Sequence, residues 1–173
     1  MYDAPFDPAQ AGELVDLGNG EVELRFERLL NHPLDKVWNA ISIPERIGAW
    51  FCEMTFEARP GARIDQTFHH AGGVTATGEV LRFEPPHLFE WRWDGVGDER
   101  ASVVTWRLEA EGENTTRIYL THRTPDRHQA HDFGHGWHVH LDGLVQALQG
   151  GRFVFPLPND KEVADHYKAA FGT

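Results

Sequence analysis

Hydrophobic and polar residues alternate along most of residues 21–124. In the first run, Val22, Leu24 and Phe26 fall on one side and charged residues fall on the other. A strand with one buried face produces this pattern, because successive side chains point to opposite faces of the sheet. Further runs of the same kind, separated by short turns rich in Gly or Pro, predict about seven strands in one antiparallel meander.

Two segments follow a helical period instead. After the break at Asn31-His32-Pro33, Leu34, Val37, Trp38 and Ile41 recur at helical spacing, and Ser42 with Glu45 predicts a capping box that starts a second short helix. A long amphipathic stretch, Phe133–Leu148, predicts the helix that closes the domain. The hydrophobic residues of its inner stripe are Phe133, Trp137, Leu141, Leu144 and Leu148.

This order of elements predicts an α+β fold, in which a curved antiparallel sheet wraps around the long helix and leaves a cavity between them. We expect residues 1–20 to form an N-terminal arm and residues 21–150 to form the domain. Residues 151–173 are expected to form a C-terminal tail with a short helix from Lys161 to Phe171, in which Phe153–Phe155 is a candidate edge segment.

The charge balance narrows the class of partner. The chain has 173 residues, with 16 Lys and Arg against 27 Asp and Glu, and a formal net charge of -11. This sign disfavours nucleic acid and anionic membrane surfaces as partners. The single cysteine, Cys52, has no partner for a disulfide within the chain, and residues 1–5 lack the pattern of a signal peptide. We therefore expect a cytoplasmic location, while the oligomeric state, including a homodimer, stays open.

Four groups of motifs carry a resemblance to a known family. They are Arg25–Arg28 followed by His32-Pro33 and Val37-Trp38; Pro44-Glu45 followed by Trp50-Phe51; Gly78–Val80 followed by Glu84–Pro86 and the strand ending in Trp93; and Leu120–His122 followed by Gly136–Leu141. In their order and spacing, over about residues 15–150, the chain resembles the START-related (SRPBCC) superfamily. Within it, the chain is similar to the bacterial branch related to the C-terminal domain of the Hsp90 ATPase activator.

The resemblance implies a helix-grip fold with a pocket between the sheet and the C-terminal helix. It implies little about chemistry, because the superfamily supports many functions on one fold. The eukaryotic activator has a separate N-terminal domain that engages the chaperone. Only about twenty residues precede the first expected strand here, so we expect this chain to lack that domain.

The leading functional hypothesis is a non-catalytic domain that binds a small hydrophobic or aromatic molecule in the cavity. The residues expected to line it are Trp38, Trp106, His122, Trp137, His140, Leu141 and Leu144. The two histidines would be polar handles on apolar walls, although the same pattern is also typical of a packed core in which each ring has a neighbouring partner. An empty apolar cavity of about 300 Å³ would cost roughly 7 kcal/mol, so the space must be hydrated, occupied or collapsed onto bulky aromatic side chains.

Two alternative functions stay open. One is an enzyme of the cyclase or dehydratase kind, with His122 or His140 as general base. The other is a chaperone-linked module that binds a partner protein through an exposed apolar patch near Phe153 and Phe155.

A histidine cluster near the start of the closing helix raises the question of a metal site. On one helix, His131, His135 and His138 would share a face, with Asp142 one turn further on. However, Gly134 and Gly136 favour a break in the helix, and the spacing matches no familiar zinc motif. We therefore expect no metal and no cofactor.

Overall fold

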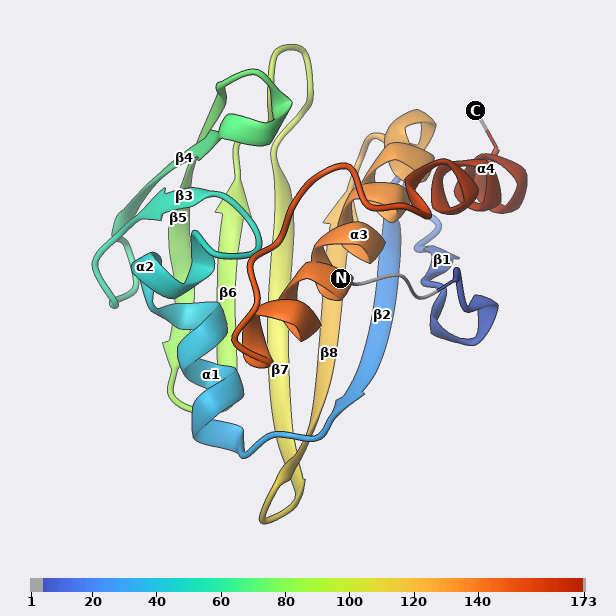
Figure 1. Cartoon of the computed structure of the whole chain (residues 1–173). Helices are drawn as coiled ribbons and strands as arrows, with labels where there is room; N and C mark the ends of the chain where they lie inside the picture. The colour runs from blue at the N-terminus through green and yellow to red at the C-terminus, as the bar shows by residue number, and fades with distance from the viewer. Residues whose placement is uncertain (1–4, 173) are drawn as a thin grey trace.

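A single antiparallel sheet, in the order β1-β2-β8-β7-β6-β5-β4-β3, forms the framework of the computed structural model, which describes residues 5–172 (Figure 1). Its strands are β1 (Glu13–Asp16), β2 (Val22–Leu30), β3 (Glu53–Thr55), β4 (Arg63–Phe68), β5 (Val74–Glu84), β6 (Leu88–Trp93), β7 (Ser102–Gly112) and β8 (Thr115–Thr124). The helices are α1 (Leu34–Ser42), α2 (Pro44–Ile47), α3 (Ala130–Leu148) and α4 (Asp160–Phe171). Short 3-10 turns are η1 (Pro8–Gln10), η2 (His69–Ala71) and η3 (Arg127–Gln129).

The helices lie on one face of the sheet, and α3 crosses in front of its central strands (Figure 1). Burial alternates along the strands as the sequence predicts, with Leu120 and His122 of β8 inside and Tyr119 and Thr121 less buried. The predicted α+β helix-grip fold, with two short helices after the first long strand and a long C-terminal helix, is confirmed.

The strand count differs by one. We expected about seven strands, whereas the described residues form eight. The additional strand, β1, lies within the predicted N-terminal arm and pairs with β2, Leu14 lying opposite Leu24. Four residues with two adjacent hydrophobic positions carry no detectable alternation, so pattern analysis could not find it.

Three local predictions are wrong. Ile43, not Ser42, caps α2, and the Ser42 hydroxyl donates to the Trp38 carbonyl at 2.7 Å instead of closing a capping box. Helix α3 begins at Ala130 and continues through Gly134 and Gly136 without a break. Residues 153–155 form no strand.

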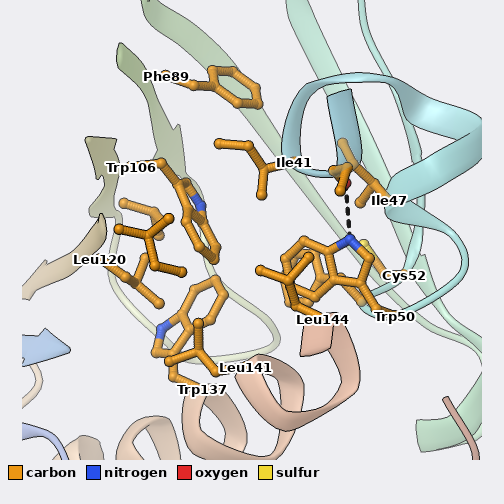
Figure 2. Packing of buried hydrophobic residues seen from close by; sticks show 14 of the residues in the cluster. Ile41, Ile47, Trp50, Cys52, Phe89, Trp106, Leu120, Trp137, Leu141 and Leu144 are labelled. Atoms are coloured by element: carbon orange, nitrogen blue, oxygen red, sulfur yellow. Dashed lines mark hydrogen bonds between the residues drawn. The ribbon is translucent and has the colours of Figure 1, made fainter. Parts of the chain in front are cut away.

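The interior beneath α3 is filled mainly by aromatic rings (Figure 2). Trp106 lies between Trp50 and Trp137, with ring centroids 5.7 and 5.9 Å away in edge-to-face geometry. The Trp50 indole nitrogen also donates to the Ala40 carbonyl at 2.9 Å, which ties the rings to α1. The cavity expected from the sequence has therefore largely collapsed onto bulky side chains.

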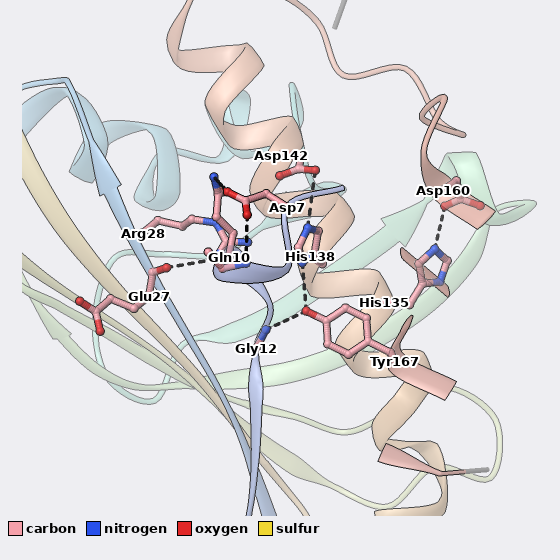
Figure 3. Close-up of polar contacts among 11 residues, drawn as sticks. Asp7, Gln10, Gly12, Glu27, Arg28, His135, His138, Asp142, Asp160 and Tyr167 are labelled. Carbon is pink, nitrogen blue, oxygen red and sulfur yellow. Dashed lines mark hydrogen bonds and ion pairs between the residues drawn. The ribbon is translucent and has the colours of Figure 1, made fainter. Parts of the chain in front are cut away.

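The C-terminal tail docks on the outer side of α3 through Tyr167, which is fully buried. Its hydroxyl accepts from the Gly12 backbone N–H at 2.8 Å and lies 3.0 Å from His138 Nδ1, so it joins the N-terminal arm, α3 and α4 (Figure 3). The close approach requires a glycine, because a Cβ at Gly134 would lie 2.6 Å from Tyr167 Cδ1. No helix within residues 5–172 is long and apolar enough to cross a membrane.

Candidate functional site

An open apolar pocket of about 260 Å³ remains at one end of the domain, where the β4–β5 and β6–β7 connections meet the first half of α3. The lining residues are Phe51, Phe68, Ala71, Val74, Trp93, Val96, Glu99, Asp132, Phe133, Gly136, Trp137 and His140. Strands β4, β5 and β6 each contribute a residue from the end nearest the pocket. Here the first half of α3 covers the hydrophobic face of the sheet only in part.

Stacked aromatic rings form the walls of the pocket. Phe51 stacks on Trp137 with centroids 5.2 Å apart, and Phe68 stacks on Trp93 with centroids 5.9 Å apart. Phe133 contributes a fifth ring from the first turn of α3. Aromatic side chains offer large apolar contact surfaces at a low cost in conformational entropy, and such walls suit a flat or apolar molecule.

Of the seven residues predicted to line a cavity, Trp137 and His140 lie on this pocket. The others lie deeper in the core: Trp106, Leu141 and Leu144 are at most 1% exposed (Figure 2), and Trp38 packs against Phe83 at a centroid distance of 5.4 Å. Periodicity identified the inward faces correctly. It did not show which of the inward-facing residues are enclosed in the core and which border the pocket.

His122 is a core residue held on both ring nitrogens. The Trp137 indole N–H donates to Nδ1 at 2.9 Å, so the ring proton lies on Nε2, which donates to the Ser102 hydroxyl at 2.8 Å. Complete burial lowers the pKa of His122 to about 3. A neutral ring with both nitrogens engaged serves to orient Trp137, which is itself part of the pocket wall.

His140 lies at the edge of the pocket. Its Nδ1 donates to the Trp50 carbonyl at 3.0 Å, which leaves Nε2 as the acceptor of the neutral ring. Burial, together with the nearby His70 and His135, lowers its pKa to about 4, against the opposing effect of the Trp50 hydrogen bond. At neutral pH His140 is therefore an uncharged polar group.

Ten of the twelve lining residues were not among those predicted, and six of these ten are aromatic or acidic: Phe51, Phe68, Trp93, Glu99, Asp132 and Phe133. Phe68 and Trp93 could have been found, because each is a large aromatic residue at or near the end of a predicted strand and ends its strand, β4 or β6, in the structure. Glu99 could not have been placed, because it lies in the β6–β7 loop. Gly95 and Gly97 turn that loop with positive φ values of 86° and 61°, and no periodic pattern describes it.

The Glu99 carboxylate closes this loop by accepting from the Val96 N–H at 2.9 Å. Burial, followed by the negative charges of Asp126 and Asp132, raises its pKa, although the Val96 hydrogen bond opposes the shift. The neighbouring Arg100 is held elsewhere, since its Nε bonds to Asp126 Oδ1 at 2.7 Å. The mouth of the pocket thus carries negative charge.

A larger concavity, of about 680 Å³, lies on the opposite face of the sheet. Its charged side chains neutralise one another: Arg117 bonds to both Glu27 and Glu111, and Arg107 lies 4.0 Å over the Tyr119 ring. Its apolar residues are mixed with these charged side chains and include no stacked aromatic pair among the described ring contacts, so the smaller pocket is the better candidate site.

The histidine cluster is divided among separate partners. His135 bonds to Asp160 of α4 at 2.7 Å, and His138 lies between the Tyr167 hydroxyl and Asp142, 3.9 Å from Asp142 Oδ2 (Figure 3). Within residues 5–172, no group of three or more His, Cys, Asp or Glu side chains is placed to hold a metal ion.

The predicted apolar patch in the tail is only partly present. Phe153 packs against His140, at a centroid distance of 5.4 Å, and over Gly143. Val154 is 70% exposed and Phe155 is 38% exposed. Val154 and Phe155 therefore form only a small exposed patch. Phe153, the other residue of the predicted pair, packs against α3.

Comparison with known proteins identifies the family. The family model described as activator of Hsp90 ATPase homolog 1-like protein matches residues 31–149. The chain belongs to this family. Its fold is that of the START-related superfamily, as the element order indicated. None of the curated proteins matches this family member significantly.

Several solved structures share the fold along nearly the whole chain. CalU16 from Micromonospora echinospora is 26% identical, with a TM-score of 0.76, over 95% of this chain and 100% of CalU16. A Bordetella parapertussis protein encoded by the gene BPP1335 is also 26% identical, with a TM-score of 0.71, over 96% of this chain and 94% of its own. DynU16, a protein of the dynemicin biosynthetic locus, is 26% identical with a TM-score of 0.66, and the match covers 76% of this chain and 48% of DynU16.

Proposed function

We propose that this protein binds a small, mainly apolar or aromatic molecule in the pocket between the sheet and the first half of α3, and that it is not a catalyst. The observation that carries the proposal is the pocket itself, in which five aromatic rings from β4, β6, α3 and the segment after α2 surround about 260 Å³ of open space. Four of these rings are at most 9% exposed, and a ligand that covers the apolar surface still open to water gains free energy from that burial.

The relatives support a small-molecule role at the level of the family. DynU16 belongs to a biosynthetic locus, and its similarity extends over three quarters of this chain. A cytoplasmic location is part of the proposal and is supported by the lone, buried Cys52.

Catalysis by a cavity histidine is the weaker candidate. A general base should have a pKa near the working pH and a free nitrogen within reach of the substrate. His122 has both nitrogens engaged and a pKa lowered to about 3, and the pKa of His140 is lowered to about 4. Both rings therefore hold their protons too weakly to act as bases near neutral pH.

Binding can be tested by filling the pocket from a position that tolerates a side chain. A Cβ at Gly136 would meet no atom within 4 Å, so Gly136→Leu projects into open space without a clash. We expect 2-(1-naphthyl)ethanol to bind the unmodified protein in calorimetric titration and to bind Gly136→Leu at least about tenfold more weakly.

Gly112→Leu is the matched control, because Gly112 also has open space around it but lies at the β7–β8 hairpin. Native mass spectrometry of freshly purified protein provides an independent measurement of bound small molecules. Equal affinities in both variants would place the binding site elsewhere. A protein that carries no added mass and binds no apolar probe would overturn the proposed function.

A further inference from the structure

We propose that the ligand of this pocket carries a positively charged amine next to its apolar body, and that Glu99 and Asp132 receive that amine at the mouth. This inference rests on the proposed function and specifies the chemical class of the ligand. It follows from the hydrogen-bonding groups on the pocket wall. The side-chain donors are already bonded or buried, whereas acceptors remain accessible.

The charged residues on the pocket wall are all acidic. Glu99 comes from the β6–β7 loop and Asp132 from the first turn of α3, whereas none of the twelve lining residues is Lys or Arg. One oxygen of Glu99 accepts from Val96 N–H, and a carboxylate has room for further donors on its second oxygen. Two carboxylates that line the same pocket and lie near enough to affect one another create an attractive potential for a cation.

The hydrogen-bond donors on the lining side chains are already engaged or enclosed. Trp137 donates to His122, and His140 donates from Nδ1 to the Trp50 carbonyl. The Trp93 indole nitrogen is buried, so it does not reach the open space. The side-chain groups still available, two carboxylates and His140 Nε2, are all acceptors at neutral pH, and acceptors require a ligand that donates.

The nearest protein cations do not neutralise this charge. Arg100 is bound to Asp126 and to the Pro125 carbonyl. His131 Nε2 lies 3.4 Å from Asp132 Oδ1, and Asp132 is 71% exposed, so its carboxylate remains open to a second partner. Below the mouth, Phe68 and His122 stack on Trp93 and Phe51 stacks on Trp137, so the attraction for the amine comes from the two carboxylates.

Three probes with the same aromatic body separate the contributions of shape and charge: 2-(1-naphthyl)ethylamine, 2-(1-naphthyl)ethanol and the carboxylate 1-naphthaleneacetate. Measured by isothermal titration calorimetry at neutral pH and low ionic strength, the amine should bind about tenfold more tightly than the alcohol. The carboxylate should bind most weakly. The advantage of the amine should shrink at high ionic strength, because salt screens exposed charges.

Glu99→Gln and Asp132→Asn keep the shape of each side chain, and a glutamine oxygen can still accept from Val96 N–H. Each variant should reduce the advantage of the amine over the alcohol several-fold and leave the affinity for the alcohol unchanged. Glu113→Gln, an exposed change of equal charge at the β7–β8 hairpin, should leave both affinities as they are.

The outcomes distinguish this inference from the proposed function. If all three probes bind equally, the charge preference is overturned while apolar binding stands. The same holds if the amine keeps its advantage in the variant that combines Glu99→Gln with Asp132→Asn. If none of the three binds, the proposed function fails together with it.

Discussion

At the scale of single residues, a buried chain of polar groups holds an aromatic ring in position. Ser102, His122 and Trp137 form a chain of hydrogen bonds of 2.8 and 2.9 Å that runs from β7 through β8 to α3. A neutral imidazole is suited to the middle of such a chain, because one nitrogen donates and the other accepts. The chain ends at the ring of Trp137, which links the solid core to the open pocket.

We predict that Ser102→Ala lowers the free energy of unfolding by about 1–3 kcal/mol, because the buried His122 N–H loses its acceptor. Ser42→Ala is the control. The Ser42 hydroxyl donates to a helical carbonyl, Trp38 O, so its loss leaves no buried donor unpaired and should cost less than about 1 kcal/mol. Urea denaturation of both variants measures the difference, and equal costs would show that His122 does not depend on this partner.

At the scale of elements, α3 has three different contact surfaces, and its glycines mark two of them. At Gly134 an added Cβ would lie 2.6 Å from Tyr167, and at Gly143 it would lie 2.6 Å from Phe153, so both positions are in close contact with the tail. At Gly136 the added atom would meet nothing within 4 Å, because this position faces the open pocket. A third face carries Trp137, Leu141 and Leu144 into the core.

Alanine substitutions at two of these glycines should therefore have opposite effects on stability. Gly136→Ala is expected to raise the free energy of unfolding by up to about 1 kcal/mol, because alanine is the better helix former and the space is free. Gly134→Ala should lower it by about 1–3 kcal/mol, because the rigid, buried ring of Tyr167 must move. Thermal denaturation gives the sign, and stabilisation by both variants would show that α4 does not dock as described.

At the scale of the whole molecule, a large share of the interior depends on histidines that stay neutral. Burial is the main cause that lowers the pKa of His122 and His138 to about 3 and that of His140 to about 4. In the unfolded chain the same rings have a pKa of about 6.5. Below that value the unfolded state binds more protons than the folded state, so the stability of the fold decreases as the pH falls.

The predicted loss begins at about pH 6.5 and continues to about pH 4 for His140 and to about pH 3 for His122 and His138, with each of the three rings contributing up to about 1.4 kcal/mol per pH unit. The protein should consequently unfold in mild acid, because a domain has only about 5–15 kcal/mol of stability in total. Denaturant titrations from pH 7.5 to pH 5 measure the slope as protons taken up on unfolding.

His140→Phe, which removes one of these rings, should reduce that slope by about one proton. A free energy of unfolding that is constant across the range would contradict the burial of these three histidines.

The sequence by itself determined the alternation that defines the long strands, the helical stripe of α3 and the excess of negative charge. These features are local or additive: a period of two or 3.6 residues shows which side chains share a face, whatever lies opposite. Family motifs supported the same element order. The position of α1 and of the C-terminal helix, read from spacing and composition, also followed from the chain alone.

Only the tertiary structure decided which inward-facing residues are packed and which remain open. Trp106 and Trp93 both face inward and both contact α3, yet Trp106 is enclosed in the core whereas Trp93 also borders the open pocket. The edge strand β1, the docking of Tyr167 on Gly134 and the approach of Glu99 to Asp132 join residues that are distant in the chain. Contacts of this kind depend on how the elements pack together. The pattern of hydrophobic and polar residues along the chain does not show which distant residues meet.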